Sequence, residues 1–88
     1  MDAPEVTIYT SAWCGYCMRA KALLDGKGIT YREVDVDGNR ALREEMIARS
    51  GRRTVPQVFI GEHHVGGSDD LAAAARTGEL DRLLGISA

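Results

Sequence analysis

The hydrophobic pattern of this chain changes period several times, and the order of those changes restricts the fold more than any other feature. Alternating apolar and polar residues, typical of strands, occupy residues 5–10, 29–36, 54–61 and 62–67. Apolar residues three or four apart, typical of helices, occupy residues 15–27, 40–49, 69–77 and 79–85. This order predicts an α/β fold with the element sequence β-α-β-α-β-β-α-α.

The first two predicted strands are expected to run parallel, because a helix connects them. The last two strands are separated by only a short turn, so they are expected to form an antiparallel hairpin. We therefore predict a thioredoxin-like arrangement, a four-stranded mixed sheet with helices on both faces. Its length is that of one small domain, which we expect to span residues 1–88.

Composition argues against several classes of protein. Hydrophobic residues make up 44% of the chain, which is typical of a folded globular protein. The formal net charge is −2 and the basic residues are mixed with acidic ones, so we expect no nucleic-acid partner. No stretch matches the ~18 apolar residues of a membrane span, and the start, MDAPEV, lacks the pattern of a signal peptide. We therefore expect a cytoplasmic protein without a membrane partner, in a compartment where thiols are normally reduced.

The only two cysteines, Cys14 and Cys17, lie at the junction between the first predicted strand and the first predicted helix. Their spacing is compatible with a structural disulfide, half of a metal site, or a reactive dithiol. A disulfide here would close a very short loop and add only about 2 kcal/mol of stability. Zinc prefers four ligands, and the other soft candidates, His63 and His64, are expected to lie exposed in a turn. A redox dithiol is therefore favoured, in line with a C-x-x-C motif beside a β-α-β pattern.

The positions of the two cysteines predict different roles. Cys14 precedes a helix, whose unpaired N–H groups and positive dipole end stabilise an anion such as a thiolate. We therefore expect Cys14 to be the nucleophile. Cys17 shares a helix face with Ala20 and Leu24, and this apolar face is expected to be buried. Cys17 is then the resolving thiol, which attacks once Cys14 is held in a mixed disulfide.

Two further motifs follow the dithiol. TVPQVFI at 54–60 contains a proline at the start of a strand, and GGSDDL at 66–71 contains two glycines before a helix. The glycines allow a tight turn and close approach of a ligand to the backbone, and the helix start offers N–H groups to a carboxylate. Ser68 or Asp69 is expected to cap this helix, and Asp69 also offers an anion to an ammonium group.

With CGYC at 14–17 and these two motifs in the same order, the chain resembles the glutaredoxin family of the thioredoxin-like fold over about residues 6–84. The resemblance implies a glutathione-dependent thiol–disulfide oxidoreductase that reduces protein disulfides and glutathione mixed disulfides. The two cysteines would be its catalytic residues and glutathione its co-substrate. The implied partners are glutathione and proteins that are glutathionylated or contain disulfides, and the implied state is a monomer.

The same resemblance implies a glutathione-binding site. Pro56 is expected to be cis and to face the dithiol, which leaves the backbone of Val55 free to pair with the cysteinyl unit of glutathione like an added strand. The γ-glutamyl end, which carries an ammonium and a carboxylate on one carbon, is assigned to the GGSDDL segment, and the glycyl carboxylate to arginines. The implied glutathione-binding residues are Tyr16, Arg43, Arg53, Thr54, Val55, Pro56, Gly67, Ser68 and Asp69.

Three positions depart from the common family pattern. Ser11 stands where many members carry a lysine, and we expect Arg53 to compensate for the missing charge. Trp13 precedes the nucleophile as a partly exposed aromatic residue, and Gly15 replaces the proline of the common C-P-Y-C motif. Family members with Gly or Ser at that position include iron–sulfur proteins. The resemblance therefore leaves an alternative, a [2Fe–2S] cluster held in a dimer by Cys14 of each chain and two glutathiones, whereas the apo protein is expected to hold no metal.

Overall fold

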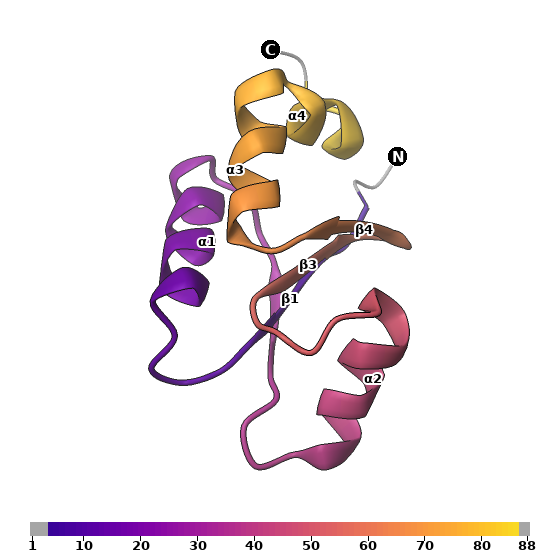
Figure 1. Ribbon diagram of the computed structural model, residues 1–88. Coiled ribbons are helices and arrows are strands. Elements are labelled where there is room, and N and C mark those ends of the chain that lie inside the picture. Colours follow the sequence, from indigo (N-terminus) through magenta and orange to yellow (C-terminus); the bar gives the residue numbers. More distant parts are fainter. Residues whose placement is uncertain (1–3, 87–88) are drawn as a thin grey trace.

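The structure of the protein is a computed structural model that describes residues 4–86. The strands β1 (Val6–Thr10), β2 (Arg32–Asp35), β3 (Gln57–Ile60) and β4 (His63–Gly66) form one sheet in the order β2-β1-β3-β4. β1 pairs in parallel with β2 and antiparallel with β3, which in turn pairs antiparallel with β4. The helices are α1 (Gly15–Gly26), α2 (Arg40–Ser50), α3 (Ser68–Thr77) and α4 (Glu79–Leu84) (Figure 1). The predicted mixed sheet and the predicted order of elements are both confirmed.

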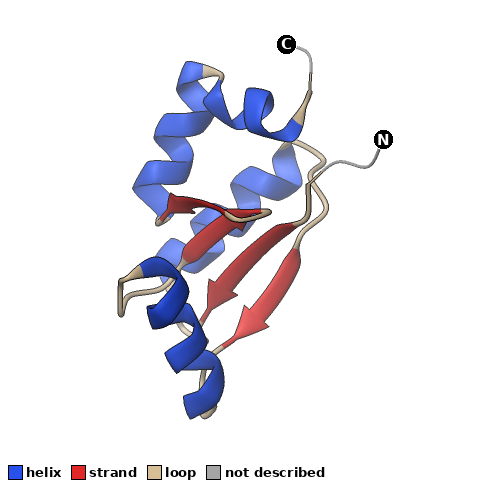
Figure 2. Ribbon diagram, turned by 90° about the vertical axis from the view of Figure 1, so that its right-hand side faces the viewer, coloured by secondary structure: helices blue, strands red, loops and turns tan. Residues whose placement is uncertain are grey.

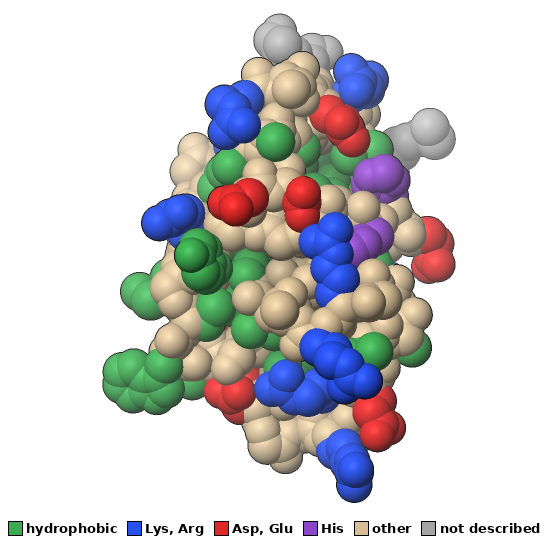
Figure 3. Space-filling model, in the orientation of Figure 1, with side chains coloured by type: hydrophobic (Ala, Val, Ile, Leu, Met, Phe, Trp, Pro, Cys, Tyr) green, Lys and Arg blue, Asp and Glu red, His purple; other side chains and the backbone are tan. Residues whose placement is uncertain are grey.

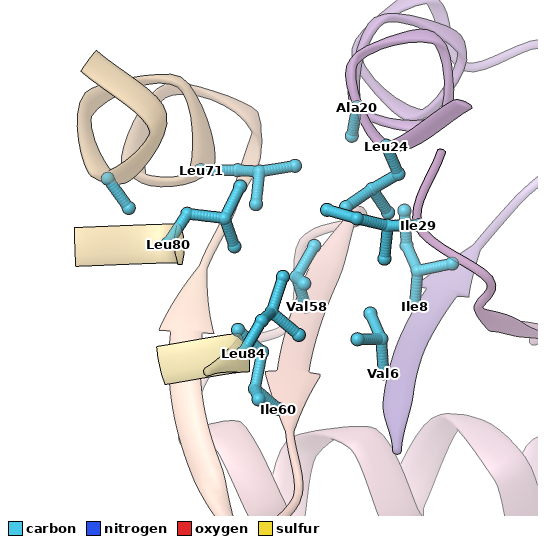
Figure 4. Packing of buried hydrophobic residues seen from close by; sticks show 11 residues of the cluster. Val6, Ile8, Ala20, Leu24, Ile29, Val58, Ile60, Leu71, Leu80 and Leu84 are labelled. Carbon is cyan, nitrogen blue, oxygen red and sulfur yellow. The ribbon is translucent and has the colours of Figure 1, made fainter. Parts of the chain in front are cut away.

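Alternation of side chains along the strands divides the core into two layers. One layer joins β1 and β3 to α1, α3 and α4 (Figure 4), and its buried members are Val6, Ile8, Ala20, Leu24, Ile29, Val58, Ile60, Leu71, Ala74, Leu80 and Leu84. The other joins the opposite face of the sheet to α2, and its members are Tyr9, Val34, Val36, Met46 and Phe59. Helices thus cover both faces, with α2 in front of the sheet and α1 behind it in Figure 2.

All four strands are shorter than the sequence predicts, and two of them, β2 and β3, are half as long. The strand expected over 54–61 begins only at Gln57, because Pro56 has no N–H to contribute to a ladder. The Val55–Pro56 peptide bond is cis, as the family resemblance implies. The strand expected over 29–36 is confirmed over Arg32–Asp35, while Ile29 remains a buried core residue beside it.

The predicted cap of α3 is wrong. The helix begins at Ser68, and the N-cap position is occupied by Gly67, which has no side chain to accept a hydrogen bond. The carboxylate of Asp70, at the third helical position, reaches back instead, and its Oδ2 accepts a hydrogen bond from the Gly67 N–H at 3.0 Å. An acidic residue therefore satisfies one of the unpaired N–H groups at this end.

Candidate active site

The dithiol lies at the N-terminal end of α1, directly after the loop that leaves β1. Cys14 is the N-cap residue of this helix, and its Sγ accepts a hydrogen bond from the backbone N–H of Cys17 at 3.1 Å. This N–H and the positive end of the helix dipole both stabilise negative charge on the sulfur. Cys14 is partly exposed, whereas Cys17 is buried. Of the two sulfurs, only that of Cys14 is therefore accessible to a substrate disulfide.

Cys17 has the properties of a protected thiol. Burial raises the pKa of Cys17 to about 12, and the neighbouring Cys14 acts in the same direction. Cys17 is therefore protonated at neutral pH and is a poor nucleophile until its surroundings change. The geometry combines one accessible sulfur that is stabilised as an anion with one buried sulfur a single helical turn away, which suits stepwise disulfide exchange.

A groove of about 330 Å³ lies beside the dithiol, between the start of α1, the loop that leads into β3, and the start of α3. The residues that line it are Tyr16, Arg52, Thr54, Val55, Pro56, Gln57, Gly67, Ser68, Asp69 and Asp70. Cys14 Sγ lies 3.8 Å from the carbonyl oxygen of Val55, so the groove adjoins the candidate nucleophile. Of the glutathione-binding residues implied by the resemblance, all line this groove except Arg43 and Arg53.

Charged side chains of the groove form an ion pair beside a second carboxylate. Arg52 Nη1 lies 3.0 Å from Asp70 Oδ2. This ion pair connects the loop after α2 to the start of α3. The hydrogen bond from the Gly67 N–H, followed by the one from Arg52, holds the pKa of Asp70 below its ordinary value. Asp69 lies exposed next to this pair.

Sequence reasoning missed three of the lining residues, namely Arg52, Gln57 and Asp70. A weak signal existed for each, since Gln57 lies within the TVPQVFI motif and Asp70 within GGSDDL. Arg52 adjoins Arg53, and their order alone does not indicate which of the two faces α3.

The loop before the nucleophile is held by Asp37. Its carboxylate accepts hydrogen bonds from Ser11 Oγ at 2.6 Å and from the Ala12 N–H at 2.7 Å. These two bonds lower the pKa of Asp37. Arg43 Nη2 lies 4.0 Å from the same carboxylate. Ser11 thus anchors the loop that carries Cys14, and the Arg43 side chain contacts the same carboxylate, that of Asp37.

Exposed apolar side chains lie next to Cys14. Trp13 is fully exposed with a φ of 60°, and Tyr16 and Met18 are mostly exposed. A left-handed backbone is uncommon for a bulky residue, and here it turns the Trp13 side chain away from the rest of the molecule. Exposure of Trp13 is thus greater than the partial exposure that we predicted. Hydrophobic side chains gather on the α1 side of the molecule, whereas Lys and Arg gather around α2 and the loop after it (Figure 3).

One chain does not offer a complete metal site within residues 4–86, where no group of three or more His, Cys, Asp or Glu side chains lies together. A metal or cluster bound to Cys14 would therefore need ligands from outside the chain. Within the same residues, no helix is long and apolar enough to cross a membrane.

Comparisons with known proteins agree with this geometry. A profile of the glutaredoxin family matches residues 6–65. Glutaredoxin 3 of Escherichia coli (strain K12) is 60% identical over 80 residues, which cover 91% of this chain and 96% of that relative. The buckwheat glutaredoxin–glutathione complex matches with a TM-score of 0.84 at 33% identity, over 96% of this chain and 83% of the other. A structure described as "Metal Binding of Glutaredoxins" matches with a TM-score of 0.73 at 54% identity, over 96% and 91% of the two chains.

A thioredoxin-like sheet with a C-x-x-C pair at the start of α1 defines a class of thiol–disulfide oxidoreductases. Within that class, this chain belongs to the glutaredoxin family. The resemblance inferred from the three motifs is thereby confirmed, and so is thiol–disulfide exchange as the general chemistry of the protein.

Proposed function

We propose that this chain is a glutathione-dependent thiol–disulfide oxidoreductase that acts in the cytoplasm on glutathionylated and disulfide-containing proteins. The observation that carries the proposal is the groove that joins Cys14 to the start of α3. Glutathione matches its features, because it has a central cysteine, free peptide groups, and an ammonium and a carboxylate at one end. Support also comes from the similar buckwheat protein, whose structure is a glutathione complex.

The cysteinyl unit of glutathione is assigned to the wall nearest the nucleophile. In this proposal its backbone pairs with Val55 like an added strand. Thr54 and Pro56 flank Val55 and hold this short segment along the groove. Tyr16 lies on the other side of the dithiol entrance and packs against the sulfur end of the ligand. The glutathione sulfur then lies beside Cys14.

The γ-glutamyl end is assigned to the start of α3. The backbone N–H groups of Ser68 and Asp69 lie in the first turn of a helix, where they suit a carboxylate. The exposed side chain of Asp69 suits the ammonium on the same carbon. Gly67 leaves room for a ligand to approach the backbone closely.

The glycyl carboxylate is assigned to the basic side of the groove. Arg52 lines that side, where it is paired with Asp70. Arg53 and Arg43 do not line the groove. This assignment gives Arg52 the contact that the sequence suggested for Arg53.

The reaction proceeds by two displacements at sulfur. The Cys14 thiolate attacks the glutathione sulfur of a mixed disulfide, a Cys14–glutathione bond forms, and the protein thiolate leaves and takes a proton from water. A second glutathione thiolate attacks this bond, releases oxidised glutathione and restores Cys14. For a protein disulfide, Cys14 forms the mixed disulfide, and Cys17 loses its proton and displaces the protein sulfur. Two glutathiones then reduce the Cys14–Cys17 disulfide.

Replacing Asp69 by asparagine is expected to raise the KM for glutathione about tenfold and to change kcat less than about twofold. The contact to the ammonium exists equally in the ground and transition states, so its loss weakens binding without slowing the chemical step. A change of about tenfold corresponds to the free energy that one hydrogen bond to a charged group contributes. Steady-state assays with a small glutathione mixed disulfide measure both constants. Glu62→Gln, which changes an exposed carboxylate beyond β3, is the matched control. An unchanged KM in the Asp69 variant would place the γ-glutamyl site elsewhere.

A second candidate function is a [2Fe–2S] cluster shared by two chains. Cys14 is a partly exposed thiol beside a groove suited to glutathione, so two chains and two glutathiones offer four thiolates. Cys17 is buried and is not among these ligands. Gly15 has open space around it and keeps a backbone N–H next to Cys14. The similar structure described as "Metal Binding of Glutaredoxins" adds support.

Anaerobic addition of iron, sulfide and glutathione is expected to give a coloured dimer, and omission of glutathione a colourless monomer. Visible absorbance and size-exclusion chromatography measure colour and size. Gly15→Pro should weaken the colour, because proline fixes φ and removes the N–H beside Cys14. The helix should persist, since Gly15 is its first residue, where proline is tolerated. Gly15→Ala, which keeps the N–H, is the control, and Cys17→Ser should retain the colour. A colourless monomer with glutathione present would leave only the oxidoreductase.

A further inference from the structure

Strand β4 carries two adjacent histidines in different surroundings. His63 is exposed, whereas His64 is half-buried. The prediction that both lie in a turn is wrong, because both belong to β4. The predicted exposure holds for His63 but not for His64, because alternation along a strand turns one outward and the other onto the sheet. His64 pairs in register with Phe59 of β3, and the two rings stack with centroids 4.8 Å apart at an interplanar angle of 26°.

His64 is hydrogen-bonded to the buried side chain of Gln57. The distance between His64 Nε2 and Gln57 Oε1 is 2.7 Å. The Nε2 of Gln57 donates to the carbonyl oxygen of Thr54 at 3.0 Å and to its Oγ1 at 3.3 Å. Because the amide nitrogen donates to a carbonyl, the amide oxygen must accept, so Nε2 of His64 carries the proton. Gln57 is only 1% exposed, so water does not readily replace a lost partner.

The carbonyl group that Gln57 holds belongs to the groove. It is part of the peptide group between Thr54 and Val55, and both residues line the groove. The Thr54 carbonyl and the Val55 N–H lie in one planar unit, so a hydrogen bond to the first fixes the direction of the second. This N–H is the backbone donor that pairs with the cysteinyl unit in the proposed complex.

We propose that His64 is a positioning residue for glutathione, which acts through Gln57 to fix the peptide group between Thr54 and Val55 before the ligand binds. The inference rests on the proposed glutathione-dependent function. His64 does not line the groove, so its effect on binding is indirect. A backbone donor that is already held in one direction loses less conformational freedom on binding, and this raises affinity for the ligand that it contacts.

Two features fix the position and the protonation state of the His64 ring. The ring stacks on Phe59, and Phe59 is itself in contact with Arg49, whose Cζ lies 4.1 Å from the Phe59 ring centroid. Burial, and after it the charge of Arg52, lowers the pKa of His64, so the ring is neutral at neutral pH. A neutral ring has one N–H, and here the hydrogen bond to Gln57 uses it.

Two substitutions of His64 separate its hydrogen bond from its stacking. His64→Phe keeps an aromatic ring over Phe59 but removes the donor. His64→Gln loses the ring but keeps an N–H at the same number of bonds from the backbone. His63→Phe, at the exposed neighbouring position, is the matched control.

The kinetic test compares a glutathione mixed disulfide with bis(2-hydroxyethyl) disulfide, which contains no glutathione. His64→Phe is expected to raise the KM for the glutathione substrate about five- to tenfold, the usual effect of one lost hydrogen bond. Its single-turnover rate with the glutathione-free disulfide should stay within about twofold of the parent, because Cys14 itself is unchanged. His64→Gln and His63→Phe should both behave like the parent.

A second measurement does not depend on glutathione. In the ligand-free protein, His64→Phe is expected to shift the ¹H–¹⁵N resonances of the Val55 amide and of the Gln57 side chain, and His64→Gln to restore them. Unchanged resonances and an unchanged KM in His64→Phe would overturn the inference. Equal loss of rate with both disulfides, together with a lower melting temperature, would overturn it too by showing a merely structural role. If the parent itself shows no saturation by glutathione, the proposed function fails, and the resonances still decide whether His64 positions the peptide group.

Discussion

Replacing Cys14 by serine is expected to abolish thiol transfer to every substrate, whereas replacing Cys17 by serine is expected to leave the removal of glutathione from mixed disulfides intact. Cys14 is the accessible sulfur at the N-cap of α1, and a serine hydroxyl cannot take its place as an anionic nucleophile at neutral pH. We expect a loss of at least about 10³-fold, as for other removed nucleophiles. Cys17 is needed only to resolve a protein disulfide. The glutathione-coupled assay, run with both kinds of substrate, measures these differences, and equal losses in the two variants would contradict the assigned roles.

Alkylation at controlled pH distinguishes the same two sulfurs in the unmodified protein. The thiolate is the reactive form, and burial raises the pKa of Cys17 to about 12, so Cys17 stays protonated below that pH. Iodoacetamide at pH 7 is therefore expected to modify Cys14 and to spare Cys17. Mass spectrometry of the digested protein identifies the modified residue. Modification of Cys17 at pH 7 in folded protein would show that its sulfur is more accessible than the structure indicates.

Gly66→Ala is expected to disrupt the groove more than any other exchange of a glycine for alanine in this chain. Gly66 has a φ of 123°, which residues with a side chain rarely adopt, and a Cβ there would overlap the carboxylate of Asp70. Asp70 would have to move and would lose both the Gly67 N–H and Arg52. The backbone strain and the lost helix cap together should lower the free energy of unfolding by about 2–4 kcal/mol. Urea denaturation measures this change, and the KM for glutathione should rise with it.

Two control variants identify the cause of that effect. Gly15→Ala adds the same methyl group where no heavy atom lies within 4 Å, and it should change the free energy of unfolding by less than about 1 kcal/mol. Asp70→Asn keeps the shape of the side chain but removes the charge that pairs with Arg52, so it should reproduce only part of the loss. A Gly66→Ala protein as stable as the parent would contradict the close packing of Gly66 against Asp70.

Local features of the sequence determined the order of the elements and the position of the dithiol. The two-residue period of β1 and the helical period of α1 are visible without any partner segment, because each repeats within a few residues. Where one period ends and the other begins, Cys14 must lie near a helix N-terminus, and Cys17 must share the face of Ala20 and Leu24. The structure agrees, with Cys14 at the N-cap and the other three residues buried.

Only the tertiary structure decided which of two neighbouring side chains of one type lines the groove or contacts a residue that does. Arg52, not its neighbour Arg53, pairs with Asp70, which lies 18 residues further along the chain. His64, not His63, reaches Gln57 across the β3–β4 pair. Composition does not distinguish neighbouring residues of one type, and alternation along a strand does not show which of the two contacts a given remote residue. Their directions differ because loops and strands that are remote in sequence pack together, and that packing exists only in the folded chain.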